Sequence, residues 1–341
     1  MEDQSSSATG IPIDAVIAWV DGNDPVLTAK RMSYMNGLTP DITSGAHSTR
    51  FASVNEIRYC VLSVLRFAPF IRNIFIVTDN QNPGLEEDLQ TFFPEKRSSV
   101  RIVDHTEIFG GFEKYLPTFN SISIASMIWR IKGLSQNFIY LNDDSFLVRP
   151  VSPDDFFIDG RPVLRGRWVP APVPRVMFDR LRALIRTRLM KEHDFNLRAS
   201  FHIGQWNSAA LLGFRVRYFT NSHTPHTVDL LTVEEFFGRH RESLERNISF
   251  RFRDYSQYTF ISLSNHLQLL AGNRLIRKPD FIYLKPVNRS GDYINRKIRI
   301  CEENHNIKFI CAQSLDQCSK EDQDKLFSWL DDRLQLHQAV G

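Results

Sequence analysis

Apolar runs alternate with stretches of helical periodicity over the first 150 residues of the chain. Runs typical of buried strands cover residues 13–20, 73–79, 99–105 and 138–141. Between them, apolar residues recur three and four positions apart at about 54–66 and 121–131, which predicts two helices. Strands that alternate with helices indicate βαβ units. The predicted fold class is α/β, Rossmann-like, with a mostly parallel central sheet flanked by helices.

The pattern after residue 150 favours helices. It predicts them at 175–191, 228–246, 256–270 and 320–336, with a strand pair near 276–284 and a last strand at 307–313. We interpret residues 1–10 as a disordered N-terminus and 11–341 as one domain. Its first half, 11–160, is α/β, and its second half, 161–341, is helical and mixed.

Each predicted strand of the first half ends in polar residues, which are Asp21, Asp79, Asp104 or His105, and Asn142 to Asp144. The carboxyl ends of strands in an open α/β sheet are where such sheets bind ligands. Asp143 and Asp144 follow a buried run directly, and adjacent carboxylates need either water or a cation to offset their repulsion. A solvated turn explains the pair alone, but four polar ends at one sheet edge favour a metal site.

The loop "WVDGNDP" places Asp21, Asn23 and Asp24 around Gly22. Glycine lets the backbone turn tightly and approach a ligand, and Pro25 is expected to end the loop. The spacing resembles part of a calcium loop, but the final glutamate of an EF-hand is missing.

His223 and His226 stand three residues apart around a proline. Imidazole titrates near neutral pH and suits general acid–base chemistry, while a structural pair or a zinc site are the alternatives. Arg251 and Arg253 are predicted at the start of a helix, where a cation is unfavourable unless an anion binds. A guanidinium fork suits phosphate.

Composition describes an ordinary globular chain of 341 residues with 42% hydrophobic content. The net charge of +3 gives no argument for nucleic acid. The polar, acidic start is unlike a signal peptide, and no run approaches the ~20 apolar residues of a membrane span. The four cysteines show no C-x-x-C spacing, so we expect reduced thiols and a cytoplasmic protein.

Nine arginines fall between Arg161 and Arg198. The predicted helix at 175–191 is therefore basic as well as amphipathic. We expect it to pack on the domain with its arginines reaching along the surface to water. Contact with a polyanionic polymer, or with an anionic membrane surface at the inner face of a bacterial membrane, are the alternatives.

Four blocks of sequence resemble the Stealth family of sugar-phosphate transferases. They are "IDAVIAWVDGNDP"; a long block from "STRFASVNEIRYC" to "NDDSFLVRPVSPDDFF"; the group "WNSAALLG", "HTPHTVDLL" and "RFRDYSQYTF"; and "KFICAQSLDQ". The family includes bacterial capsular-polysaccharide phosphotransferases and the catalytic part of the lysosomal-enzyme N-acetylglucosamine-1-phosphotransferase. The resemblance covers nearly the whole chain and implies a GT-A-like arrangement.

The resemblance implies transfer of a hexose-1-phosphate, in particular an N-acetylhexosamine-1-phosphate, from a UDP-sugar to a hydroxyl of an oligo- or polysaccharide acceptor. UMP leaves, and the product is a phosphodiester-linked capsular or cell-surface polysaccharide. A metal-dependent glycosyltransferase that releases UDP is the alternative. A non-enzymatic module that binds carbohydrate or polyphosphate is a third reading.

The resemblance also assigns roles to single residues. Asp143 and Asp144 would hold Mg²⁺ or Mn²⁺ on the pyrophosphate, Arg253 would stabilise the transferring phosphate, and His223 or His226 would be the base. The substrate-binding residues would be Asp21, Asn23, Asp24, Arg50, Arg58, Asp79, Asn120, Asn142 and Asn207. Glu56 and Arg58 are expected to form a supporting ion pair. The chain departs from many members at Ala125, where they carry an acidic residue.

Overall fold

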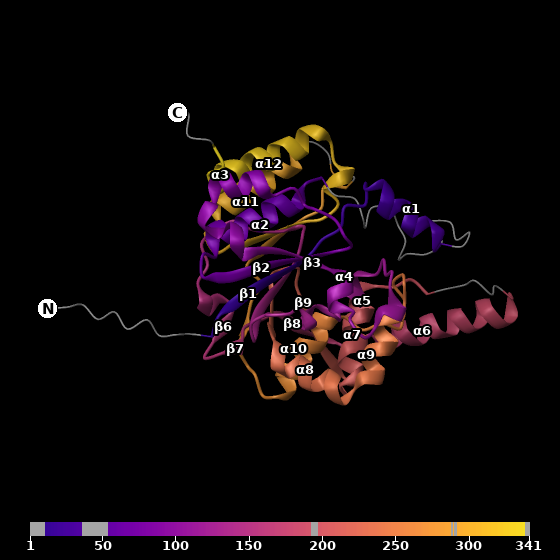
Figure 1. The fold of residues 1–341 in the computed structure, drawn as a ribbon. Coiled ribbons are helices and arrows are strands. Elements are labelled where there is room, and N and C mark those ends of the chain that lie inside the picture. Colours follow the sequence, from indigo (N-terminus) through magenta and orange to yellow (C-terminus); the bar gives the residue numbers. More distant parts are fainter. Residues whose placement is uncertain (1–10, 36–53, 192–196, 288, 290–291, 338–341) are drawn as a thin grey trace.

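The computed structural model describes residues 11–35, 54–191, 197–287, 289 and 292–337 (Figure 1). Its central sheet has five strands in the order β10-β4-β1-β2-β3. Their bounds are β1 Ile13–Ala18, β2 Ile71–Thr78, β3 Val100–Asp104, β4 Asn137–Asn142 and β10 His226–Asp229. The first four in chain order run parallel, and β10 is antiparallel to β4. The predicted α/β class with a mostly parallel sheet is confirmed.

The central strands are buried on both faces because helices cover both sides of the sheet. Ile17 of β1 packs in a core with α2 (Glu56–Phe67), α3 (Glu86–Phe92), α11 (Tyr293–Glu303) and α12 (Lys320–Leu334). Its neighbour Val16 points the other way, into a core with α8 (Leu230–Arg239), α9 (Arg241–Ile248) and α10 (Phe260–Leu270). Figure 1 shows these two helical layers above and below the sheet. Continuous apolar runs are what such burial requires.

Smaller sheets complete the molecule. One contains β12 (Phe281–Leu284), β13 (Phe309–Ala312) and β5 (Ser145–Leu147), and another β11 (Ile276–Arg277), β8 (Leu164–Pro170) and β9 (Arg217–Asn221). A hairpin pairs β6 (Phe157–Ile158) with β7 (Arg161–Pro162). The remaining α-helices are α1 (Pro25–Ser33), α4 (His105–Ile108), α5 (Ser121–Ala125), α6 (Val173–Leu184) and α7 (Phe201–Leu211). Short 3₁₀ segments cover Pro94–Ser99, Glu113–Tyr115, Ile128–Arg130, Pro153–Asp155 and Leu315–Gln317, and a π-turn covers Ile185–Leu189.

The helix predicted at 121–131 is wrong in length, because α5 ends at Ala125. The hydroxyl of Ser126 donates a hydrogen bond to the carbonyl of Ile122 at 2.8 Å, and the indole N–H of Trp129 donates one to the carbonyl of Ser126 at 3.0 Å. Side chains that occupy helix carbonyls compete with continuation of the helix. A 3₁₀ turn follows instead.

The helix predicted at 228–246 is also wrong, because Val228 lies in β10 and the helical part divides at His240 into α8 and α9. Asp229 ends the strand and caps α8 by accepting the N–H of Leu231 at 3.3 Å. The strands near 276–284 exist, but they do not pair with each other, since β11 pairs with β8 and β12 with β13.

Two further expectations about loop ends are wrong. Pro25 begins α1 instead of ending a loop, because the Asp24 carboxylate caps the helix by accepting the N–H of Val26 at 2.8 Å. Arg251 and Arg253 lie in the connection between α9 and α10, and α10 begins only at Phe260. The argument from a helix N-terminus therefore does not apply to Arg253.

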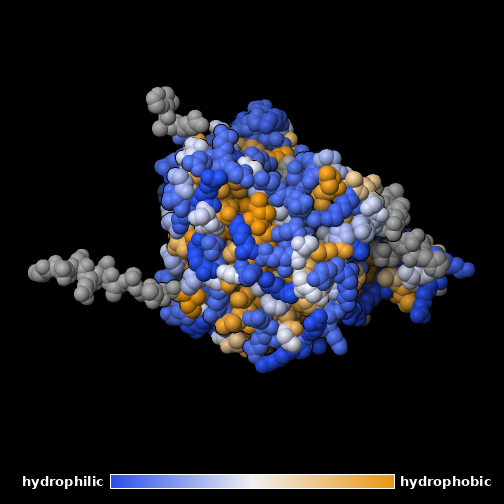
Figure 2. Space-filling view, in the orientation of Figure 1, coloured by the Kyte–Doolittle hydropathy of each residue, from blue (hydrophilic) through white to orange (hydrophobic). Residues whose placement is uncertain are grey.

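All four cysteines are free thiols, as expected. Every helix in the described part of the chain is too short or too polar to cross a lipid bilayer. The surface is a mosaic of hydrophilic and hydrophobic residues on the face that Figure 2 shows.

Candidate active site

The polar ends of the parallel strands meet at one edge of the sheet. Ala18 of β1 lies opposite Val77 of β2 and Asn142 of β4, and Thr78 of β2 lies opposite Asp104 of β3. The residues that follow each strand therefore leave the sheet on the same side. The expectation that the four polar ends share one edge is confirmed.

Asp143 and Asp144 occupy the turn between β4 and β5, where the chain leaves the central sheet for the second one. The carbonyl of Asp144 accepts the N–H of Ala312 from β13 at 2.8 Å, which anchors this turn between the two sheets. Both carboxylates are half-buried. The pair therefore sits at a junction, with Ser145 as the first residue of the next strand.

The environment of this pair disfavours two negative charges. Burial raises the pKa of Asp143, and the carboxylates of Asp144 and Glu56 raise it further. Burial also raises the pKa of Asp144, although hydrogen bonds with Cys311 and Ser145 oppose this. Such a site gains free energy from a proton or from a bound cation.

The carboxylate pair supplies only part of a metal coordination shell. Among the described residues, no group of three or more His, Cys, Asp or Glu side chains is placed to hold a metal ion. Mg²⁺ commonly takes one or two carboxylates and completes its shell with water and substrate phosphates. The arrangement of Asp143 and Asp144 fits that kind of ion better than a protein-enclosed zinc.

Tyr140 connects the carboxylates to the other predicted groups, and our sequence analysis missed it. Its hydroxyl donates to the Asn142 side-chain oxygen at 3.2 Å. Burial and the charge of Asp143 raise the pKa of Tyr140, while the charge of Arg253 lowers it, so both groups are near the ring. His226 of β10 lies opposite Tyr140 across the strand pair. One signal was available: a hydroxyl-bearing side chain in an otherwise apolar strand.

Arg253 is held by a buried polar network. Its guanidinium donates to the hydroxyl of Ser121, the first residue of α5. The amide of Asn120 donates to the carbonyl of Phe250 at 3.0 Å and to the side chain of Gln257 at 2.9 Å. The amide of Asn207 donates to the carbonyls of Tyr255 and Gln257 at 2.9 and 3.0 Å. Asn120 and Asn207 thus hold the segment that carries Arg253.

The two predicted histidines lie in different surroundings. Burial lowers the pKa of His226 to about 3, and the proximity of the titratable groups of His223 and Arg165 adds to this effect. The ring of His223 is stacked between Phe201 and Tyr283, with centroid distances of 4.9 and 5.2 Å. Burial also lowers the pKa of His223. Both imidazoles are therefore neutral at pH 7 and able to accept a hydrogen bond or a proton.

Gln81 organises the first loop, a role that the sequence did not indicate. Its side chain accepts the N–H of Asp21 at 2.9 Å and donates to the carbonyl of Asp21 at 2.8 Å. It also donates to the carboxylate of Asp24 at 3.0 Å. The carboxylate of Asp21 accepts the N–H of Asn23 at 2.9 Å, and the Asn23 side chain is exposed. The carboxylate of Asp24 is therefore occupied by hydrogen bonds within the protein.

Asp79 forms an ion pair with Lys30 of α1 at 2.7 Å, a partner that lies 49 residues away in the sequence. Beside it, burial lowers the pKa of His105 to about 4. The edge of the sheet at β2 and β3 therefore carries one cation from α1 in addition to the predicted carboxylates.

The expected ion pair between Glu56 and Arg58 is wrong. Arg58 binds the carboxylates of Asp88 and Asp331 at 2.7 and 3.2 Å. These lie on α3 and α12. Glu56 and Arg58 are two positions apart on α2, and side chains at that spacing on a helix do not face each other. Arg50 lies outside the described residues. Ala125 is buried in the core, so position 125 supplies no charge here.

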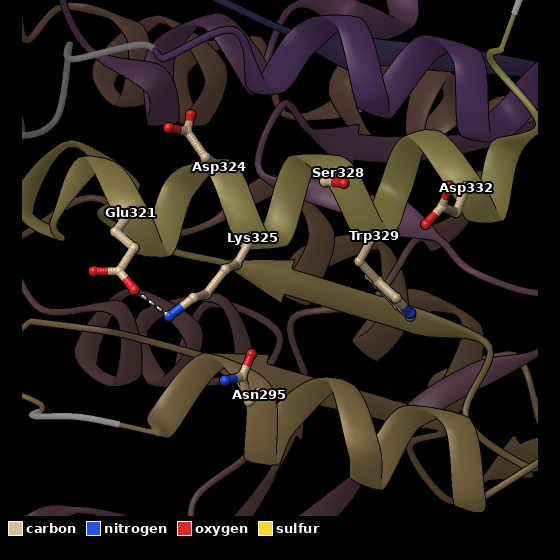
Figure 3. A pocket seen from close by; sticks show the side chains of 7 residues that line it. All are labelled: Asn295, Glu321, Asp324, Lys325, Ser328, Trp329 and Asp332. Carbon is tan, nitrogen blue, oxygen red and sulfur yellow. Dashed lines mark hydrogen bonds and ion pairs between the residues drawn. The ribbon is translucent and has the colours of Figure 1, made fainter.

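A surface hollow of about 690 Å³ lies between α11 and α12 (Figure 3). It is lined by Asn295, Glu321, Asp324, Lys325, Ser328, Trp329 and Asp332. None of these residues ends a strand of the central sheet, and Lys325 is paired with Glu321 at 2.7 Å. We place the candidate active site at the strand edge, where the titratable groups converge.

Comparisons with known proteins match the same regions. Residues 12–39 match the family model "Stealth protein CR1, conserved region 1", and residues 50–163 match "Stealth protein CR2, conserved region 2". The first region contains Asp21 to Asp24, and the second contains Asp143 and Asp144.

Two relatives of this chain are named as phosphotransferases that act on polysaccharides. The receptor polysaccharide phosphotransferase WefC of Streptococcus gordonii is 30% identical over 291 residues, which is 82% of this chain and 84% of that protein. An exopolysaccharide phosphotransferase of Streptomyces coelicolor is 42% identical over 164 residues, or 48% of this chain. The match spans only 26% of that relative's length.

Two solved structures also align with the chain. The galactosyltransferase LgtC, in complex with donor and acceptor sugar analogs, has a TM-score of 0.43 and 10% identity, covering 96% of this chain and 97% of that one. Mouse xyloside xylosyltransferase 1 has a TM-score of 0.37 and 12% identity, covering 91% and 100%. The matched conserved regions and the extent of the similarity to WefC show that this chain belongs to the Stealth family.

Proposed function

We propose that the protein transfers a sugar-1-phosphate from a UDP-sugar to a hydroxyl of a saccharide acceptor and releases UMP. The observation that carries the proposal is the convergence of Asp143, Asp144, Arg253 and His226 around the end of β4. The names of the relatives, exopolysaccharide and receptor polysaccharide phosphotransferases, support a phosphoryl transfer to a polysaccharide. An N-acetylhexosamine-1-phosphate is the proposed group.

Asp143 and Asp144 would hold Mg²⁺ or Mn²⁺ in this proposal. When bound, such an ion neutralises charge on the pyrophosphate oxygens. The fit rests on two half-buried carboxylates whose repulsion a cation relieves. Water and the donor phosphates would supply the other ligands.

Arg253 would bind the non-bridging oxygens of the transferring phosphate. A planar guanidinium donates two parallel hydrogen bonds to such oxygens. Because these donors are in position before the reaction, they stabilise charge in the transition state without reorganisation. The network of Asn120, Asn207 and Gln257 holds its segment in that position. Asp21 and Asn23, at the end of β1, would bind the donor nucleotide or sugar.

A neutral histidine would accept the proton of the acceptor hydroxyl. The low pKa of His226, about 3, makes it a weak base in the free protein. The anionic pyrophosphate of a donor bound nearby raises the pKa of an imidazole because opposite charges favour the protonated form. His223, which is stacked between two aromatic rings, is the second candidate for the same step.

The test is to incubate the protein with UDP-N-acetylglucosamine, Mg²⁺ and a saccharide acceptor, and to separate UMP from UDP. We expect UMP together with a phosphodiester signal in the ³¹P spectrum of the product. Release of UDP would instead establish the glycosyltransferase alternative.

Asp144→Ala, Arg253→Ala and His226→Ala should each lower turnover at least ~100-fold, because they act on charge in the transition state.

Asp154→Asn is the matched control, because Asp154 is an exposed carboxylate ten residues beyond Asp144 and outside the strand edge. It should retain wild-type turnover. Near-wild-type activity in any of the three site variants would remove that residue from the proposed mechanism.

A further inference from the structure

The apolar side of α6 faces water. Met177, Phe178 and Leu181 are 65%, 63% and 55% exposed. Val173, Leu184 and Ile185 extend the same stripe and are also exposed. Not one residue of α6 is buried. Large apolar side chains gathered on one exposed face mark an interaction site more often than single ones do.

The opposite side of α6 holds the helix on the body. Val176 packs against the cluster that contains Trp206. The carboxylate of Asp179 accepts the hydroxyl of Tyr255 at 3.0 Å and lies 3.8 Å from the Arg175 guanidinium. These contacts fix which side of the helix points outward. The expectation that the apolar face packs on the domain is wrong.

Figure 1 shows α6 running outward from the body, beyond α7 and α9. In Figure 2 the protruding end at the right carries both hydrophobic and strongly hydrophilic residues. An apolar stripe on a protruding helix is sterically open to a flat surface.

The charge beside the stripe is positive. Arg175, Arg180, Arg182 and Arg188 are exposed. Asp179 is the single acidic residue between positions 173 and 191, and it is turned toward Tyr255. The outward side of α6 therefore combines apolar side chains with a segment in which basic residues outnumber acidic ones.

The exposed apolar side chains and the basic residues together distinguish among the molecules that could cover this face of α6. A sugar-phosphate polymer would pair with the arginines but leave Phe178 and Leu181 in water. A second copy of the chain, docked helix to helix, would bring arginine against arginine. An anionic lipid surface satisfies both features, because headgroups pair with arginine while apolar side chains enter the acyl boundary.

We propose that α6 docks the protein onto the surface of a membrane that contains anionic lipids. The helix lies on the interface and does not cross it. Tyr255, which holds α6, is two residues from Arg253, so the docking helix is anchored to the segment that carries one of the candidate site residues. The proposal concerns binding alone and stands whether or not the proposed phosphotransfer is correct.

Flotation of the full chain with lipid vesicles tests it. We expect binding to vesicles of equal parts phosphatidylglycerol and phosphatidylcholine, and none to phosphatidylcholine alone. Phe178→Ser with Leu181→Ser should lower the partition coefficient about tenfold or more, because the stripe loses its largest side chains. Arg180→Glu with Arg188→Glu should lower it by a similar factor, and salt should weaken wild-type binding.

Leu231→Ser with Leu270→Ser is the matched control, since both leucines are exposed, at 52% and 57%, but lie on α8 and α10. It should bind like the wild type, and thermal melts should show that all variants fold. Absent binding, equal binding to neutral vesicles, or equal losses in the control would overturn the proposal. Self-association that depends on Phe178 and Leu181, without lipid binding, would assign the face to a second copy instead.

Discussion

At the scale of one residue, Asp143 illustrates a conflict between the proposed metal binding and the stability of the folded protein. Its carboxylate is half-buried beside Asp144 and within reach of Glu56. Because the folded-state pKa is raised, the folded protein keeps a proton that the unfolded chain releases. Its contribution to stability is full below the unfolded pKa of about 3.9 and is lost as pH rises toward the folded value. At neutral pH the charge is therefore unfavourable.

Asp143→Asn should accordingly stabilise the fold while abolishing function. Without divalent metal at pH 7.5, we expect the free energy of unfolding to rise by on the order of 1 kcal/mol, since the repulsion is removed. Urea denaturation measures this, and UMP release should fall at least ~100-fold in the same variant. A destabilised or fully active variant would contradict the interpretation of this turn. Asp154→Asn, on the exposed neighbouring segment, should change neither quantity.

At the scale of an element, strand β10 shows that tertiary contacts can override the structure that the local sequence pattern predicts. Residues 226–229 follow a proline and lead into helical periodicity, so the sequence places Val228 in a helix. In the structure the segment pairs with β4 as an antiparallel edge strand, and Asp229 caps α8. Pairing across 86 residues, from Tyr140 to His226, overrides the local preference. This pairing also brings His226 to the site.

The burial of His226 in β10 should make stability depend on pH. Its folded-state pKa of about 3 lies below the unfolded value of about 6.5, so the unfolded chain binds the proton first. Its stabilising contribution is present above pH 6.5 and falls as pH decreases toward the folded value. Between pH 7 and 5 this costs the wild type up to about 2 kcal/mol.

His226→Asn lacks this titration, so its stability should decline less between the same two pH values. Urea denaturation at pH 7 and pH 5 compares the two proteins. Parallel losses in wild type and variant would show that His226 does not stay neutral in the fold. His305→Asn, at an exposed position, serves as the control with unchanged pH dependence.

Two sheets and two helical layers cooperate at the scale of the whole molecule. The turn with Asp143 and Asp144 lies between the central sheet and the β12-β13-β5 sheet, and Arg253 of the α9–α10 connection lies near Tyr140 in the strand that precedes this turn. Cores on both sides of the central sheet combine residues from both halves of the chain. The candidate site therefore forms only when both halves are folded together.

Mg²⁺ should stabilise the whole molecule through this site. A ligand that binds only the folded state raises the melting temperature with its concentration. We expect the wild-type melting temperature to rise on addition of Mg²⁺ or Mn²⁺ and to return after chelation. The Asp143→Asn, Asp144→Asn double variant should show no rise, and Asp154→Asn should respond like the wild type. An equal rise in the double variant would place the ion elsewhere.

The sequence alone determined the parallel strands and the polar edge that they share. Buried strands need continuous apolar runs, and parallel strands end at one edge, so Asp21, Asp79 and Asp143 could be grouped from local pattern. Polar residues at the ends of apolar runs are visible without any knowledge of distant contacts.

Only the tertiary structure decided which residues join that edge and how α6 is oriented. Lys30, Gln81 and Tyr140 became visible through contacts between distant segments. Amphipathic periodicity shows that α6 has an apolar side, but not whether that side faces inward. The bond from Tyr255 to Asp179, which spans 76 residues, turns the apolar side toward water. Local patterns carry no information about such long-range contacts, which form only when the chain is folded.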